Sequence, residues 1–183
     1  MRNVWLKMMS SFNRQGPMLK WLWLSVILII LDQVSKQIAS NVLEMHQPVA
    51  VMPMFNWTLM HNPGAAFSFL SDAGGWQRWF FTIIAIVISA VLVVWTSQLK
   101  KNEKWQAIAF ALVLSGALGN AIDRIMYGYV IDFIDVYYNE SLPHWPAFNI
   151  ADSAIFVGVV ILLIDAFRQY KDEKAEKGEV RNG

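Results

Sequence analysis

Four long runs of apolar residues dominate the hydropathy pattern of the chain. A helix needs roughly 20 mostly apolar residues to cross about 30 Å of hydrocarbon. The second run carries Trp79 and Trp95 near its two ends, where aromatic side chains anchor a helix at the membrane interfaces. The pattern therefore predicts four transmembrane helices. Their expected positions are 18–39, 79–97, 105–124 and 152–169.

The segment between the first two runs has a different pattern. At about 43–70, short stretches rich in Val, Phe, Trp and Thr are separated by proline residues. Such stretches predict two or three short strands, which we expect to form a small β-sheet on the membrane surface. Residues 72–79 predict a surface turn that leads into the second helix. The chain is then one membrane domain, 18–170, between a basic leader, 1–17, and a charged, frayed tail, 171–183.

The distribution of basic residues sets the expected orientation of the helices. Twelve of the fifteen Lys and Arg residues precede the first helix, follow the fourth, or lie between the second and third. Basic residues concentrate on the cytoplasmic side of membrane proteins, so both termini should be cytoplasmic. The segments 40–78 and 125–151 should then face outward. The expected fold class is an all-α membrane protein with four transmembrane helices, a small extracytoplasmic β-sheet and a surface loop or helix.

The first apolar run also has features of a cleaved signal peptide, because a basic leader precedes it. No small-x-small cleavage site follows it directly, however, and three further hydrophobic runs come after it. We therefore interpret it as a retained helix.

Composition narrows the possible classes of protein. Hydrophobic residues make up 56% of the chain and charged residues 16%, whereas a typical soluble domain is about 25% charged. Such an apolar chain has ample surface to bury, which excludes disorder. Its net charge of +1 is not the basic excess of a nucleic-acid-binding protein. The absence of Cys excludes disulfides, thiol nucleophiles and thiolate metal sites.

Charged and amide side chains gather at the ends of three of the predicted helices. An ionisable group at the bilayer centre costs roughly 2.5–3.5 kcal/mol on insertion scales, so a chain keeps such groups when they are paired or used. With the topology above, all of these residues lie at the outer face, which predicts a shared polar site. They are Asp32, Lys36, Asn120, Asp123, Arg124, Asp132, Asn149 and Asp152.

Structural roles remain open for most of these residues. Asp32 and Lys36 have the i,i+4 spacing of a helical ion pair, and Asp152 suits a helix cap or first turn. Arg124 opposes the positive-inside trend, which indicates that acidic residues hold it. Asp132 differs, because Val, Ile and Phe flank it in GYVIDFIDV with no cation beside it. Desolvation should raise its pKa, as general acid–base catalysis requires.

Other catalytic chemistries find little support in the residue pattern. The three histidines, His46, His61 and His144, lie in outer loops and form no pair at metal-ligand or triad spacing. We therefore expect no metal and no cofactor. The remaining candidates are Asp132 and Asp152, two carboxyls that share a proton when they lie close together. One would act as a base on water while the other, protonated, polarises a carbonyl group.

Four sequence strings occur in an order that covers nearly the whole chain. They are LDQVSK at 31–36, HNPGAAFSFL at 61–70, GALGNAIDRIMYGYVIDF at 116–133 and FNIADSAI at 148–155. Together they resemble lipoprotein signal peptidase, or signal peptidase II, a family of aspartic peptidases of the bacterial inner membrane. The family fold of four transmembrane helices and a small extracytoplasmic sheet matches the fold expected above.

The resemblance implies roles for individual residues. Asp132 and Asp152 would be the catalytic pair, and Asp123 would be structural, tying Arg124 in place. Substrate-binding or supporting roles would fall on Asp32, Lys36, Asn62, Gly116, Asn120, Arg124, Asn149 and Ala151.

The resemblance also implies the substrate and its setting. The substrate would be a prolipoprotein whose lipobox cysteine carries diacylglycerol, cut on the amino side of that cysteine near the periplasmic face. Small residues at Gly64, Ala65 and Ala66 would let a peptide pass closely, and residues 72–79 would gate entry. We expect a multi-pass monomer in contact with membrane lipids and with no nucleic-acid partner.

Two other classes of function compete with a peptidase. A small proton-coupled transporter also uses carboxylates within the membrane, but it needs polar residues through the whole membrane depth, whereas the second and fourth runs are apolar for most of their length. A non-catalytic scaffold would leave the clustered acidic residues unexplained.

Overall fold

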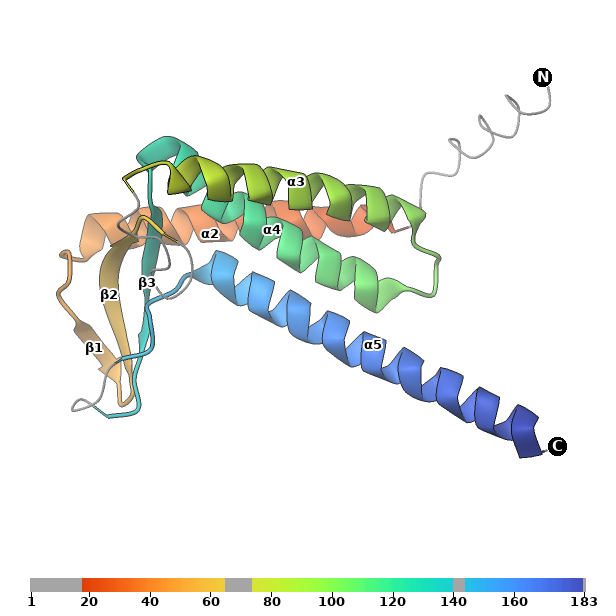
Figure 1. Cartoon of the computed structure of the whole chain (residues 1–183). Helices are drawn as coiled ribbons and strands as arrows, with labels where there is room; N and C mark the ends of the chain where they lie inside the picture. The colour runs from red at the N-terminus through yellow and green to blue at the C-terminus, as the bar shows by residue number, and fades with distance from the viewer. Residues whose placement is uncertain (1–17, 65–73, 140–143, 183) are drawn as a thin grey trace, which may run out of the picture.

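The computed structural model describes residues 18–64, 74–139 and 144–182 (Figure 1). The elements are η1 (Leu19–Trp21), α2 (Leu22–Val42), β1 (Val49–Met52), β2 (Phe55–Asn62), α3 (Gln77–Gln98), α4 (Lys104–Tyr127), β3 (Val130–Val136) and α5 (Ile150–Asn182). Several expectations lie outside the described residues: the leader 1–17, the sheet region at 65–70 with Ala65 and Ala66, and the first two residues of the expected turn 72–79.

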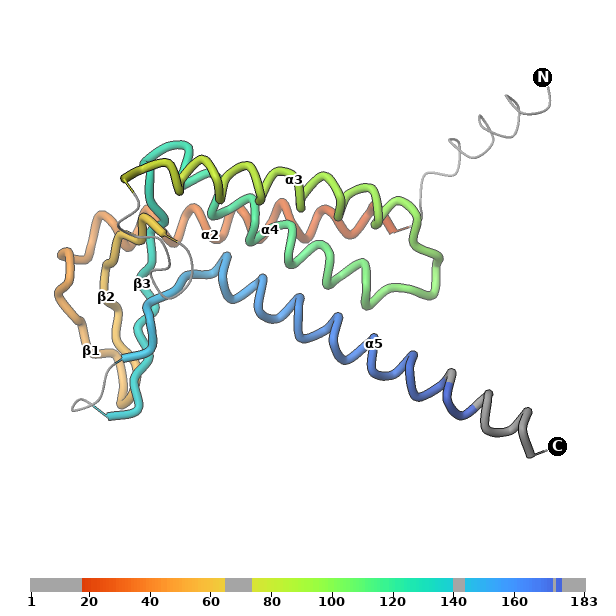
Figure 2. Tube along the Cα trace, in the orientation of Figure 1, coloured from red at the N-terminus to blue at the C-terminus, as the bar shows by residue number. Residues whose placement is uncertain are grey.

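Four of the described helices are long and apolar enough to cross a membrane, which confirms the expected fold class. The helix α4 contacts each of the other three and is mostly buried, whereas α2, α3 and α5 leave most of their apolar side chains exposed. Exposed apolar side chains along a helix of this length are typical of a lipid-facing surface. Figure 2 shows α4 between its neighbours, with α5 diverging from the bundle toward the C-terminus.

Small residues allow α4 and α5 to approach closely. A Cβ atom added to Gly116 would overlap the carbonyl oxygen of Ala151 and the side chain of Ile155. At Gly158 an added Cβ atom would lie 2.9 Å from the Ala109 carbonyl oxygen. Glycine at such positions brings helix backbones together in membranes, so these two residues fix the distance between α4 and α5.

A glycine cap reverses the chain at the end of α4. Gly128 has a φ of 87°, and its N–H group donates to the Arg124 carbonyl oxygen. Glycine adopts this left-handed conformation without the steric penalty of a Cβ atom. The strand β3 begins two residues later, so the last turn of α4 and the strand that carries Asp132 lie close together.

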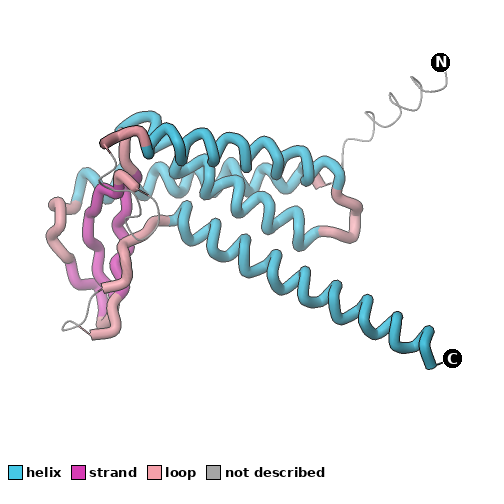
Figure 3. Tube along the Cα trace, viewed as in Figure 1, coloured by secondary structure: helices cyan, strands magenta, loops and turns pink. Residues whose placement is uncertain are grey.

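A three-stranded antiparallel sheet of order β1-β2-β3 lies at one end of the helices (Figure 3). The strands β1 and β2 fall in the expected region at 43–70, but β3 comes from residues 130–136, where no strand was expected. Val130, Ile131 and Phe133 of this strand are buried. The register pairs Met60 with Asp132 and Asn62 with Val130, which brings the end of β2 beside Asp132.

The ends of the other helices also differ from expectation. Residues 77–79 belong to α3 rather than to a surface turn. The turn that precedes α3 contains Gly74 and Gly75, which both have positive φ angles. The charged segment from Lys171 onward continues α5 to Asn182, where a frayed tail was expected.

Candidate active site

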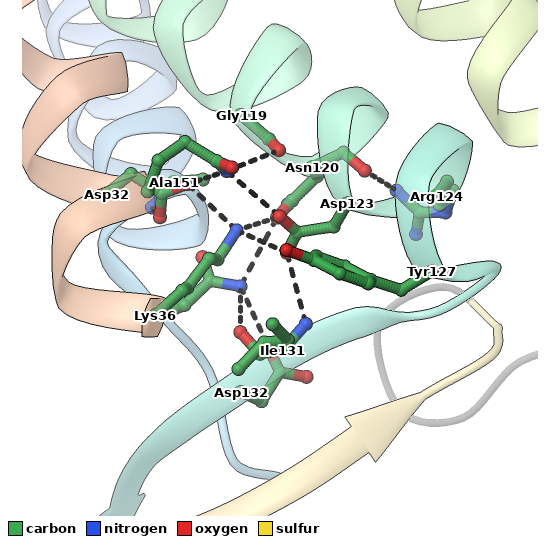
Figure 4. Close-up of polar contacts among 12 residues, drawn as sticks. Asp32, Lys36, Gly119, Asn120, Asp123, Arg124, Tyr127, Ile131, Asp132 and Ala151 are labelled. Atoms are coloured by element: carbon green, nitrogen blue, oxygen red, sulfur yellow. Dashed lines mark hydrogen bonds and ion pairs between the residues drawn. The ribbon is translucent and has the colours of Figure 1, made fainter. Parts of the chain in front are cut away.

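The structure brings the predicted site residues together where three helices meet the sheet. We call this region the sheet end of the bundle: residues 32–36 of α2, 116–124 of α4 and 150–155 of α5. Figure 4 shows side chains from α2 and α4 converging there on the strand that carries Asp132. The gathered residues are Asp32, Lys36, Asn62, Gly116, Asn120, Arg124, Asp132, Asn149, Ala151 and Asp152.

Asp132 is a buried carboxyl group on β3, with 2% of its surface exposed. One oxygen accepts a hydrogen bond from the Asn149 amide at 2.7 Å, and the other accepts from Asn62 at 3.2 Å. Burial raises the pKa of Asp132 to about 7, and the neighbouring Asp152 carboxyl adds to the rise. The bonds from Asn62 and Asn149 and the charge of Lys36 oppose it. The rise in pKa expected from its apolar neighbours is thus present and has the expected cause.

Asp152 lies in the first turn of α5 and forms a reciprocal cap with Asn149. The Asn149 side-chain oxygen accepts from the Asp152 N–H group at 2.9 Å, and an Asp152 carboxyl oxygen accepts from the Asn149 N–H group at 3.3 Å. This is the geometry of a capping box. The other carboxyl oxygen accepts from the Asn120 amide at 2.7 Å. Asp152 therefore has the cap role considered above and also faces the polar cluster.

Asn149 joins the two candidate catalytic residues. It is fully buried, and its side-chain amide donates to Asp132 while its backbone N–H group donates to Asp152. The two carboxyls thus flank a single residue, and their charges act on one another. A pair in this relation can share one proton, because two adjacent carboxylates do not both ionise easily.

A buried ion cluster lies next to this pair. The Lys36 ammonium group is 2.8 Å from carboxylate oxygens of both Asp32 and Asp123, and all three residues are at most 1% exposed. The Gln33 amide donates to both carboxylates, at 3.2 and 2.9 Å. Gln33 was missed in the sequence, although a polar residue between Asp32 and Lys36 in an otherwise apolar helix could have indicated it.

The interpretation of Asp123 requires correction. It was expected to hold Arg124, but its carboxylate bonds Lys36, Gln33 and the Ile131 N–H group. The Arg124 guanidinium instead donates to the carbonyl oxygen of Gly64 at 2.8 Å and lies over the Phe81 ring. Adjacent residues on a helix point about 100° apart, so neighbours in sequence need not share partners.

Arg124 is still surrounded by negative charge. The carboxyl groups of Asp152, Asp132 and Asp123 all stabilise its positive charge through space. The idea that acidic residues keep Arg124 at this end of the bundle therefore stands, although its direct hydrogen bonds go to backbone carbonyl groups.

A second polar cluster lies in the sheet and was also missed. Asp135 accepts hydrogen bonds from the Thr58 hydroxyl at 2.7 Å and from a ring nitrogen of His144 at 2.8 Å. The hydroxyl bonds the carboxylate rather than the imidazole, so the cluster lacks the nucleophile–base contact of a catalytic triad. It ties the segment after β3 to the sheet. The alternation of apolar and acidic residues in VIDFIDV was the available signal for it.

His61 lies on β2 rather than in a loop. Its ring stacks on Tyr129 with centroids 3.9 Å apart. Burial lowers its pKa, and the nearby His46 adds to this effect. Among the residues that the structure describes, no three His, Asp or Glu side chains are grouped as a metal-binding site requires.

Known proteins resemble this chain in both sequence and structure. The family described as signal peptidase (SPase) II matches residues 24–168. A lipoprotein signal peptidase of Alteromonas mediterranea is 50% identical over 171 residues, which cover 93% of this chain and 92% of that protein. One of Pseudomonas aeruginosa strain UCBPP-PA14 is 55% identical over 171 residues, covering 93% of this chain and all of its own.

Two solved structures of bacterial membrane enzymes, obtained by the in meso method, share the fold. The first has a TM-score of 0.74 and 34% identity, and covers 84% of this chain and 90% of its own. The second has a TM-score of 0.69 and 35% identity, and covers 80% and 92%.

Proposed function

The chain belongs to the signal peptidase II family, and from that premise we propose that Asp132 and Asp152 are its catalytic pair. The enzyme is an aspartic peptidase, a multi-pass membrane protein that removes signal peptides from prolipoproteins. The family does not by itself identify the catalytic residues of this chain. The observation that carries the assignment is that one buried residue, Asn149, donates to both carboxyls. Its side-chain amide donates to Asp132 and its backbone N–H group donates to Asp152.

The proposed reaction uses one proton shared by the pair. The ionised aspartate takes a proton from water as the water oxygen attacks the scissile carbonyl carbon. The protonated aspartate donates its proton to the carbonyl oxygen, which gives a neutral tetrahedral intermediate. On collapse, the aspartate that is now protonated gives its proton to the nitrogen, the aspartate that is now ionised takes a proton from a hydroxyl group of the intermediate, and the C–N bond breaks. The products are a signal peptide with a new carboxyl terminus and a lipoprotein with a free α-amino group.

The pKa of Asp132 suits this chemistry. With its pKa raised to about 7, Asp132 can gain or lose a proton near neutral pH, so the pair can hold one proton between its two carboxyl groups. General acid–base catalysis is most effective when the pKa lies near the working pH. Burial is the main cause of the raised pKa, and it also keeps bulk water away from the pair.

We propose that cleavage occurs on the amino side of the diacylglyceryl-modified cysteine. The lipid chains of such a substrate would remain among the acyl chains of the bilayer, which fixes the depth of the scissile bond. Asp152 lies at the start of a membrane-length helix and Asp132 on the adjoining strand. We expect the anchored bond to lie at this depth, and such positioning would lower the entropic barrier to reaction.

The three asparagines around the pair have a proposed orienting role. The side chains of Asn62, Asn120 and Asn149 donate to three of the four carboxyl oxygens of Asp132 and Asp152, and the Asn149 backbone N–H group donates to the fourth. We propose that Arg124, which donates to the Gly64 carbonyl oxygen, holds the chain just after β2 near the pair. Gly116 and Ala151 have a packing role, because no side chain fits at Gly116 beside the Ala151 backbone.

The orientation of the protein follows from its charge distribution. We propose that both termini are cytoplasmic and that the sheet end faces the periplasm of a bacterial inner membrane, because basic residues flank the opposite helix ends. We propose a monomeric enzyme, since the pair and its asparagines come from a single chain. A proton-coupled transporter is not retained, because the chain belongs to a family of peptidases.

The test uses purified protein in detergent with a prolipoprotein precursor that does or does not carry diacylglycerol. Wild-type protein should shorten only the lipidated precursor. Asp132→Asn and Asp152→Asn should each reduce the rate by about 10²–10⁴-fold or more, the usual contribution of acid–base groups. Circular dichroism should show that both variants keep their helices. Retained cleavage in either variant would remove that residue from the pair, and equal cleavage of the unmodified precursor would exclude the proposed substrate requirement.

A further inference from the structure

Lys36 has an unusual position for a lysine within a membrane-length helix. Only 1% of its surface is exposed, and its ammonium group has three partners: Asp32 at 2.8 Å, Asp123 at 2.8 Å and the Asn120 side-chain oxygen at 3.0 Å. An ammonium group has three hydrogens to donate, so this set of acceptors satisfies it completely. Figure 4 shows the group at the centre of these contacts.

The first branch of this cluster leads to Asp152. The Asp32 carboxylate accepts from Lys36 through one oxygen and from the Ala151 N–H group through the other, at 2.9 Å. Ala151 directly precedes Asp152 in α5. Gly119 leaves the space that the carboxylate occupies, because an added Cβ atom there would lie 2.7 Å from an Asp32 oxygen.

The second branch leads to Asp132. One oxygen of the Asp123 carboxylate accepts both from Lys36 and from the Ile131 N–H group, which is 3.1 Å away. Ile131 directly precedes Asp132 in β3. The two carboxylates that bind Lys36 therefore each hold the backbone amide of the residue before one of the catalytic pair.

The third branch fixes the direction of an amide group. A lysine ammonium group can only donate, so the Asn120 oxygen must face Lys36. The amide nitrogen of Asn120 then faces Asp152, to which it donates at 2.7 Å. The Asn149 side-chain amide also donates to the Asn120 oxygen, at 3.2 Å, so Lys36 and Asn149 together keep this oxygen turned away from the Asp152 carboxyl group, which would repel it.

Stability alone is a weak reason to keep such a cluster. Removing charges from water is costly, and an apolar replacement of similar volume is often equally stable. The three branches instead connect α2, α4, β3 and α5 at the two residues whose relative position matters for the reaction.

We propose that Lys36 is a positioning residue that sets the geometry of Asp132 and Asp152 together, through Asp32, Asp123 and Asn120. This inference rests on the proposed catalytic pair and adds Asp123, with Gln33 as its donor, to the residues on which the reaction depends. None of these side chains needs to touch the substrate for this role.

The first test compares two replacements of Asp123. Asp123→Asn keeps an oxygen for Lys36 and the Ile131 amide and loses only the oxygen that accepts from Gln33, whose amide keeps its bonds to Asp32 and Gly119. Asp123→Leu has a similar size and no acceptor. We expect Asp123→Leu to lower kcat by about 100-fold, the effect of a displacement of about 1 Å, with KM for the lipidated precursor nearly unchanged. Asp123→Asn should recover at least a tenth of the wild-type kcat.

Ser25→Ala is the matched control, because Ser25 makes another buried α2–α4 bond, to the Ala111 carbonyl oxygen at 2.7 Å, away from the pair. It should lower the Tm while kcat stays at the wild-type value. The proposal is overturned if Asp123→Leu and Asp123→Asn have the same kcat, or if Ser25→Ala lowers kcat as much as Asp123→Leu does.

The second test removes the positive charge of Lys36. The Lys36 charge lowers the pKa of Asp132, so Lys36→Met should move the basic limb of the pH–kcat profile to higher pH. An unmoved limb in a folded Lys36→Met variant contradicts the proposal, and if that variant does not fold, the Asp123 comparison decides.

Asp132→Asn is measured in parallel to separate the two proposals. If it still cleaves, the catalytic assignment itself fails. If it is inactive while Asp123→Leu keeps its kcat, only the positioning role of the Lys36 cluster fails.

Discussion

The two ends of the helix bundle are held together by different forces. At the sheet end, α2, α4 and α5 meet through Lys36, Asp32 and Asp123, whose hydrogen bonds have defined directions. At the opposite end, which we call the far end, Leu92 of α3 packs against Phe110 and Leu114 of α4. The hydrogen bonds between helices that the structure describes there are isolated ones, from Ser25 to the Ala111 carbonyl oxygen and from Gln106 to Asp165. Apolar contacts tolerate small shifts, whereas a hydrogen bond weakens steeply with angle and distance.

The difference between the two ends indicates where the bundle must be rigid. Helix packing alone would keep the bundle folded, but it would not hold two carboxyl groups in register to within a fraction of an ångström. We therefore expect changes at the sheet end to affect the reaction and changes at the far end to affect mainly stability.

The largest expected effect is the loss of folding stability that the buried Asp132 carboxyl causes at neutral pH. Its pKa is raised in the folded state from about 3.8 to about 7, so the folded protein binds more protons than the unfolded chain within that window. Stability is therefore lost as pH rises from 4 to 7. Asp132→Asn removes this loss of stability, which is on the order of 4 kcal/mol for a rise of three pKa units. The poorer hydrogen bonds of the amide offset about 1 kcal/mol of that gain.

Thermal unfolding in detergent at pH 5 and pH 8 measures this effect. The inactive Asp132→Asn variant should be more stable than wild type at pH 8 and lose less stability between the two pH values. An equal loss in both proteins would mean that Asp132 does not cause it.

Two glycine-to-alanine substitutions, one toward each end of the bundle, test the difference between the two ends directly. Gly116→Ala at the sheet end would push against the Ala151 carbonyl group, and Gly158→Ala toward the far end would push against Val113 and Ala109. Both should lose about 1–3 kcal/mol of stability, as overpacked sites do. Only Gly116→Ala should also lower kcat, by about 100-fold, because Ala151 precedes Asp152. Cleavage rates and unfolding temperatures of both variants provide the measurement, and an equal loss of kcat at both sites would contradict the comparison.

A smaller effect is expected from one hydrogen bond to the pair. The Asn62 amide stabilises the ionised form of Asp132 and so lowers its pKa. Asn62→Ala should raise that pKa by roughly half to one unit, the equivalent of about 1 kcal/mol. The basic limb of the pH–rate profile, where both carboxyls become ionised, should then move to higher pH.

Thr58→Val is the control for Asn62→Ala. Thr58 lies on the same strand but bonds Asp135 instead of the pair, so its replacement should leave the limb in place. Movement of the limb to lower pH in Asn62→Ala would be the wrong sign for the proposed role.

The smallest expected effect lies at the tip of the sheet. Met54 has a φ of 69°, a left-handed conformation that a residue with a Cβ atom adopts only with strain. Met54→Gly should therefore stabilise the protein by a few tenths to about 1 kcal/mol, with kcat unchanged. Met52→Gly, on the adjacent strand, should destabilise it. A fall in kcat for Met54→Gly would show that the tip is coupled to the pair.

Much of the fold could be predicted because hydropathy is a local property. The transfer free energy of each side chain belongs to that residue alone, so four apolar runs identify four membrane-length helices. The gathering of charged residues at one end of the bundle followed in the same way, as did the raised pKa of Asp132, whose flanking residues already desolvate it. These predictions required no knowledge of which segments are neighbours in space.

The contacts of the site required the folded chain. The Ala151 amide and the Asp32 carboxylate are 119 residues apart in sequence, and Asn62 and Asp132 are 70 apart. The partner of Asp123 was assigned wrongly because the adjacent Arg124 was the obvious candidate, whereas helix geometry turns Asp123 toward Lys36. The strand β3 was missed because only pairing with β2 makes it a strand.

By itself the sequence determined a membrane protein with four helices, its acidic residues at one end and Asp132 and Asp152 as the candidate pair. Only the tertiary structure decided that Asn149 lies between the two carboxyls, and that Asp32 and Asp123, both bound to Lys36, accept from the amides of the residues before them. The physical reason is that burial depends on composition along the chain, whereas a hydrogen bond forms only when packing brings two atoms to within about 3 Å in the right direction.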